Sequence, residues 1–75
     1  MLNDKQKAEL KKLGSGLVEV FGLGTKLSEE LIEFAANVET EMEIKLIKAV
    51  LFNKIEARSR NQVLDFIVWA YKQVK

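Results

Sequence analysis

Apolar residues recur at three- and four-residue steps along most of this chain, a pattern typical of amphipathic α-helices. In the first segment, one apolar stripe is formed by Leu10, Leu13, Leu17 and Phe21. The stripe predicts a helix over residues 3–21, which Gly22 and Gly24 end because glycine readily takes the left-handed C-cap conformation. The sequence Gly-Ser-Gly at 14–16 falls inside the stripe. Since an interior glycine costs about 1 kcal/mol relative to alanine, we expect a bend or fraying there; in the alternative, residues 17–21 leave the helix.

The second helix is predicted over residues 28–38. Ser28 is the expected N-cap, with Thr25 as a competing cap. The two glutamates after Ser28 lie in the first turn, where negative charge suits the helix dipole. The apolar face of this helix is formed by Leu31, Ile32, Phe34, Ala35 and Val38. The pattern is that of an ordinary amphipathic surface helix.

Thr40 and Glu43 have the spacing of a capping box, which predicts the start of a third helix over residues 40–57. Its apolar positions form a row of Ile44, Ile47, Leu51 and Ile55, widened by Met42, Leu46 and Val50. A helix that is apolar over most of its circumference is expected to pack against several neighbours. We therefore expect the third helix to be the central one.

A second capping box, formed by Ser59 and Gln62, predicts a fourth helix over residues 60–74. Its core face consists of Val63, Phe66, Ile67, Ala70, Tyr71 and Val74. The very short link from the third helix predicts that the two are neighbours, either antiparallel or sharply angled. Together the four patterns predict an all-α, compact four-helix fold in a single domain, residues 1–75.

A chain of 75 residues has a thin core, because a domain of that size buries only about 60% of the surface of its unfolded chain. The chain has no cysteine, so disulfides cannot compensate. Efficient helix packing and association with a partner are the remaining sources of stability. The size therefore favours a homodimer.

The composition is poor in catalytic and metal-binding residue types. The chain has no histidine, the commonest general base, and no cysteine, the thiol nucleophile. Both residue types are also the commonest zinc ligands. The glycine pairs lack the lysine and hydroxyl residue of a phosphate-binding loop, and the glutamates lack calcium-loop spacing. We therefore expect no enzymatic activity, no metal and no cofactor.

Charge is unevenly distributed although the net charge is only +1. Residues 14–43 carry one lysine and seven glutamates, whereas residues 44–75 carry seven basic and two acidic side chains. The acidic and the basic region can attract each other within one fold or across a dimer, or each can bind a different partner. The polar N-terminal sequence and the shortness of the longest apolar run favour a cytoplasmic protein without a membrane span.

Trp69 is the first feature that indicates a function. At 100° per residue it falls on the polar side of its helix, among Asp65, Lys72 and Gln73. A tryptophan on a polar face is typical of protein interfaces, because it removes a large apolar area from water at low entropic cost. Phe52 repeats the pattern in the third helix. The alternative is that another segment of the same chain covers both rings.

The second feature is the basic and polar region that starts the fourth helix: Lys54, Arg58, Arg60, Asn61 and Gln62. Helix N-termini bind phosphates, and these side chains read base edges in the major groove. The run RSRNQVLDFIVWAYK, about a fifth of the chain, resembles the second helix of ribbon-helix-helix DNA-binding proteins. Those proteins have a strand where this sequence predicts its third helix. In the alternative, the arginines pair with carboxylates of the chain.

These observations favour a small, non-enzymatic regulatory or adaptor module that self-associates and binds a protein partner. The second interpretation is a small dimeric nucleic-acid-binding regulator of transcription that uses the basic start of the last helix.

Overall fold

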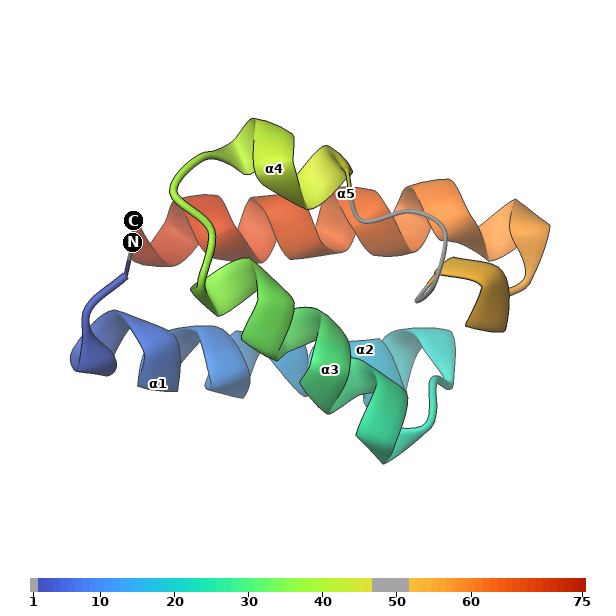
Figure 1. Cartoon of the computed structure of the whole chain (residues 1–75). Coiled ribbons are helices and arrows are strands. Elements are labelled where there is room, and N and C mark those ends of the chain that lie inside the picture. The colour runs from blue at the N-terminus through green and yellow to red at the C-terminus, as the bar shows by residue number, and fades with distance from the viewer. Residues whose placement is uncertain (1, 47–51) are drawn as a thin grey trace.

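The fold is organised around one long C-terminal helix, against which the other α-helices of the described residues pack (Figure 1). The structure is a computed structural model and describes residues 2–46 and 52–75. In chain order its elements are α1 (Asp4–Gly14), α2 (Gly16–Phe21), α3 (Thr25–Ala36), α4 (Glu41–Lys45), the short 3-10 helix η1 (Phe52–Lys54) and α5 (Ala57–Val74). The described residues form helices and no strands, which confirms the predicted all-α class. With α1 and α2 taken together as the first predicted helix, the four-helix architecture is also confirmed.

The first helix begins with a reciprocal cap that the sequence analysis did not single out. The side chain of Asn3 accepts from the backbone of Gln6 at 2.8 Å, and the side chain of Gln6 accepts from the backbone of Asn3 at 2.9 Å. Gln6 also donates from Nε2 to the backbone oxygen of Val74, 3.0 Å away. This bond joins the start of α1 to the end of α5.

The Gly-Ser-Gly sequence interrupts the first helix without breaking its direction. Ser15 keeps right-handed helical angles, and its hydroxyl donates to the Lys12 carbonyl at 2.8 Å. The expected local disturbance is therefore a one-residue turn between α1 and α2. Gly22 ends α2 in the left-handed conformation, with φ of 68°, as the sequence predicts.

Gly14 and Gly16 allow α1 and α2 to approach their neighbours closely. A Cβ atom on Gly14 would lie 2.4 Å from Cγ1 of Ile32 in α3. A Cβ atom on Gly16 would lie 2.7 Å from Cζ of Phe66 in α5. The two glycines therefore serve helix packing, which explains why the helix tolerates their low propensity.

The second helix begins earlier than the predicted start at Ser28. Gly24 is the N-cap, Thr25 is the first helical residue, and Ser28 lies within α3 as a buried side chain. The burial of Ser28 is a tertiary effect that its preference for caps did not reveal. The helix ends at Ala36, two residues before the predicted end.

The third predicted helix is wrong in length and in its central position. Its Thr40 cap is present, because the Thr40 hydroxyl accepts from the Glu43 backbone at 3.4 Å. However, α4 ends at Lys45, and the chain forms η1 and then a bend at Ile55 instead of continuing to residue 57. Residues 47–51, which include the expected core positions Ile47, Val50 and Leu51, lie outside the described residues.

The residues before and after 47–51 contact two different helices, α5 and α3. Helix α4 packs along α5, and Lys54 Nζ in η1 lies 3.7 Å from Glu30 Oε2 in α3. Ile55 then enters the core.

The central helix is α5, which begins at Ala57 and not after the predicted Ser59 cap. Glu56 is its N-cap, and the Ser59 backbone already donates to the Glu56 carbonyl at 2.9 Å. Because buried Ile55 fixes the chain just before the helix, α5 can start two residues earlier than its best capping residue. Its predicted core face is confirmed, with Phe66 only partly buried: Val63, Ile67, Ala70, Tyr71 and Val74 are buried.

Candidate functional site

Trp69 lies on the solvent side of α5 and is 48% exposed. Its ring contacts Phe66 at a centroid distance of 5.7 Å and a tilt of 41°. Phe66 in turn meets Phe21 of α2 edge-on, at 5.7 Å and 73°. This row of three rings supports the inner side of the indole on a packed base, while its outer side faces solvent.

Charged side chains surround Trp69 in a shallow depression of about 310 Å³. It is lined by Lys45, Asp65, Val68, Trp69 and Lys72. The structure thus brings together three of the predicted interface residues, Trp69, Asp65 and Lys72. Gln73 is exposed but does not line the depression. The side chain of Phe52 lies outside the described part of the structure.

One of these charges is paired within the described residues and another is not. Lys72 Nζ lies 3.5 Å from Glu41 Oε2, which ties α4 to α5. The described residues place no basic group within ion-pair distance of Asp65. The exposed indole is therefore bordered by one carboxylate and two ammonium groups.

Five further apolar side chains of the described residues are exposed that the sequence analysis did not assign to a surface. Val18 and Phe34 are 37% and 39% exposed, although Phe34 was expected on the apolar face of its helix. Val20 of α2 and Met42 of α4 are each 71% exposed, and Leu46 after α4 is 61% exposed. Met42 and Leu46 are one helical turn apart, on the side of α4 that points away from Ile44 and α5. The sequence of this segment is apolar around most of the helix circumference, which the sequence analysis interpreted as a core helix. Because one small domain cannot cover every side of such a helix, this pattern was the signal that could have revealed the exposed residues.

The basic start of α5 makes several contacts within the chain. Arg58 Nε lies 3.4 Å from the Glu56 carboxylate, and Arg60 Nε donates to the Ile55 carbonyl at 3.0 Å. Lys54 pairs with Glu30. Asn61 and Gln62 are exposed. The glutamate at the N-cap places negative charge where a phosphate would bind.

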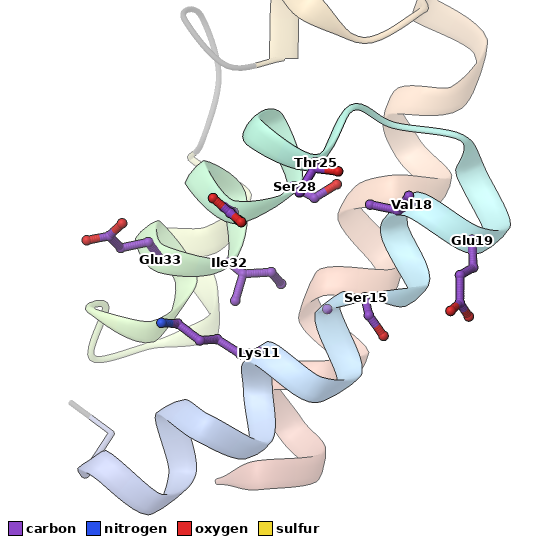
Figure 2. A pocket seen from close by; sticks show the side chains of 10 residues that line it. Lys11, Ser15, Val18, Glu19, Thr25, Ser28, Ile32 and Glu33 are labelled. Atoms are coloured by element: carbon purple, nitrogen blue, oxygen red, sulfur yellow. The ribbon is translucent and has the colours of Figure 1, made fainter.

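A larger groove lies on another part of the molecule, between α1–α2 and α3 (Figure 2). Its volume is about 480 Å³, within the range of small-molecule sites. Its apolar floor is formed by Gly14, Val18 and Ile32, and its polar border by Lys11, Ser15, Glu19, Thr25, Ser28, Glu29 and Glu33. Sequence analysis gave no signal for this groove, because its walls come from segments that only the fold brings together.

Neither surface has the arrangement of a metal centre: the described residues contain no group of three or more histidine, cysteine, aspartate or glutamate side chains placed to hold an ion. Among the helices of residues 2–46 and 52–75, none is long and apolar enough to cross a membrane.

Comparisons of the chain with models of protein families, with curated proteins and with solved structures found no significant match.

Proposed function

We propose that this protein is a non-enzymatic regulatory or adaptor module that self-associates through α5 and acts by binding proteins. The observation that carries the proposal is the position of Trp69, half exposed on a packed base of aromatic rings. A preorganised indole loses little entropy on binding, and tryptophan is among the residues that contribute most to interface affinity.

The charges beside Trp69 favour a second copy of this chain as the occupant. Asp65 precedes Trp69 by about one helical turn, and Lys72 follows it by about one turn. When two α5 helices pack antiparallel about a two-fold axis near Trp69, Asp65 of each copy lies opposite Lys72 of the other. A two-fold interface is self-complementary in this way, and it forms each ion pair twice.

Exposed apolar residues near α5 add to the surface proposed for this dimer. A standard interface takes about 800 Å² from each partner, and the molecule has an accessible surface of 4943 Å². We expect the interface to be centred on Trp69 and to extend over the exposed Met42 of α4 and Leu46 at its end.

The first test is sedimentation equilibrium over a wide concentration range, with Trp69 fluorescence recorded in the same samples. We expect a dimer with blue-shifted emission that moves to the red on dilution. Trp69→Ala should weaken the dimer about 30-fold, as expected for an interface anchor, while circular dichroism shows unchanged helicity. A wild-type monomer at all concentrations would contradict self-association.

Charge reversal tests the antiparallel arrangement itself. Asp65→Lys alone and Lys72→Asp alone should each weaken the homodimer, because like charges then face each other. An equimolar mixture of the two variants should form a heterodimer in preference to either homodimer. The matched pair Glu9→Lys and Lys26→Asp, at exposed positions outside α5, should show no such preference. Equal behaviour of the two pairs would refute the arrangement.

The second interpretation, a nucleic-acid-binding regulator, stays a prediction. It requires a salt-sensitive gel shift that Arg58→Ala together with Arg60→Ala abolishes. Absence of any shift by the wild type at low salt would exclude it. The cytoplasmic location expected from the sequence also stays a prediction and is checked by cell fractionation.

A further inference from the structure

The groove between α1–α2 and α3 has the chemistry of a binding site for a small aliphatic amine. Ser28 provides the first observation. Its side chain is buried, with the residue only 5% exposed, and its hydroxyl oxygen has no hydrogen-bond partner in the part of the chain that the structure describes. A buried hydroxyl without a partner is costly, and such groups are rare in folded proteins. In Figure 2 this side chain points from α3 toward Val18, which lines the same groove.

Charge is the second, independent observation. The groove is bordered by Glu29 and Glu33 on the α3 side and by Glu19 on the α2 side. None of these three carboxylates has an ion-pair partner among the described residues. Among the described residues, Lys11 is the one basic side chain that lines the groove, and it extends from α1 toward α3 (Figure 2). The border therefore carries an excess of negative charge.

The floor of the groove completes the pattern. Val18 and Ile32 supply apolar side chains, and Gly14 lies between them without a side chain. An occupant with a methylene chain can cover this floor, while its ammonium groups are attracted by the carboxylates that border the groove. A compact metal ion would leave the apolar floor uncovered.

We propose that this groove binds a short aliphatic diammonium compound. Its methylene chain packs on Val18 and Ile32, an ammonium N–H donates to the Ser28 hydroxyl oxygen, and Glu19, Glu29 and Glu33 balance its charge. This site lies apart from the Trp69 surface and does not depend on the proposed dimer.

The probe for the test is 1,5-diaminopentane, followed by amide chemical shifts and by calorimetry on the full chain at low ionic strength. An occupant of seven non-hydrogen atoms is expected to bind with a Kd on the order of 1 mM. Pentylamine, with one charge, should bind more weakly, and 1-pentanol more weakly still. The shifts should centre on Gly14, Val18, Ser28 and Ile32. Equal affinity for all three compounds would overturn the proposal.

Variants separate a built site from general attraction of cations. Glu29→Gln with Glu33→Gln should weaken binding of the diamine about fivefold. Glu9→Gln with Glu39→Gln removes the same charge from exposed positions that do not line the groove, and it should change affinity less than twofold. Equal losses in the two double variants would show non-specific binding and refute the site.

Substitutions of Lys11 and of Ser28 should change the affinity for the diamine in opposite directions. Lys11→Gln should strengthen binding, because it removes a cation that competes for the same carboxylates. Ser28→Ala should weaken binding about fivefold, while the melting temperature of the unliganded protein stays equal or rises because an unpaired buried hydroxyl is gone. Unchanged affinity in Ser28→Ala would refute the assigned hydrogen bond.

Discussion

Replacing Gly14 by alanine is expected to destabilise the protein, although the same change stabilises most helices. In an open helix, glycine to alanine gains about 1 kcal/mol of propensity. Here the new Cβ atom would lie 2.4 Å from Cγ1 and 2.6 Å from Cδ1 of Ile32, both far closer than van der Waals contact. Ile32 is only 4% exposed, so its side chain has little space into which to move.

The size of the effect follows from these two opposed contributions. Overpacking of a well-packed core costs about 1–3 kcal/mol, and the close approach to Cγ1, near the base of the side chain, favours the upper part of that range. After subtraction of the propensity gain, the expected net loss for Gly14→Ala is about 1–2 kcal/mol. For a domain of this length, that loss lowers the melting temperature by about 5–10 °C.

Thermal and urea unfolding, followed by circular dichroism, measure this loss. Lys12→Ala is the matched control, because the Lys12 side chain is exposed and lies in the same last turn of α1, so its change should stay within about 0.5 kcal/mol. In the double variant Gly14→Ala with Ile32→Ala, the overlapping atoms are gone and the new methyl group partly fills the cavity. The cost of Ile32→Ala, about 2–4 kcal/mol alone, should therefore shrink by at least about 1 kcal/mol when Gly14→Ala is already present. A raised melting temperature for Gly14→Ala, with additive costs in the double variant, would refute the close approach of α1 and α3.

Three other changes test particular contacts by the same unfolding assays. Tyr71→Phe removes the hydrogen bond from the buried phenol to the Val38 carbonyl, 3.0 Å long, and should cost about 1 kcal/mol; no loss would mean that this bond contributes nothing net. Asn3→Ala removes the reciprocal cap of α1 and should also cost about 1 kcal/mol, with the exposed change Lys5→Ala as its near-neutral control. Ile44→Ala truncates the fully buried residue of α4 and should cost about 2–4 kcal/mol, whereas a loss well under 1 kcal/mol would show that α4 does not pack on α5.

The repeating pattern of apolar residues determined much of the fold. It specified the helical class, the stripe that buries Leu10 and Leu17, and the core face of α5. It also placed Trp69 on the polar side of its helix, where the structure has it. These features depend on the 100° spacing of residues along one helix, so neighbouring sequence is sufficient to specify them.

The tertiary structure alone decided where helices end and which one is central. Residues 40–57 carry a helical pattern, yet α4 stops at Lys45, Lys54 pairs with Glu30 of α3, and Ile55 lies in the core. The periodicity shows that a face is apolar but not which neighbour covers it. The exposure of Met42 and Leu46 follows from this difference.

The two candidate surfaces also differ in how far the sequence alone reveals them. The anchor of the α5 surface is visible in the sequence, since Trp69, Asp65 and Lys72 lie within eight consecutive residues. The groove is not visible, because Gly14 and Ser28 lie in separate helices and the sequence marked one as a helix interruption and the other as a cap. A side chain's local preferences are encoded in its neighbours along the chain, whereas a shared groove depends on the packing of α1–α2 against α3.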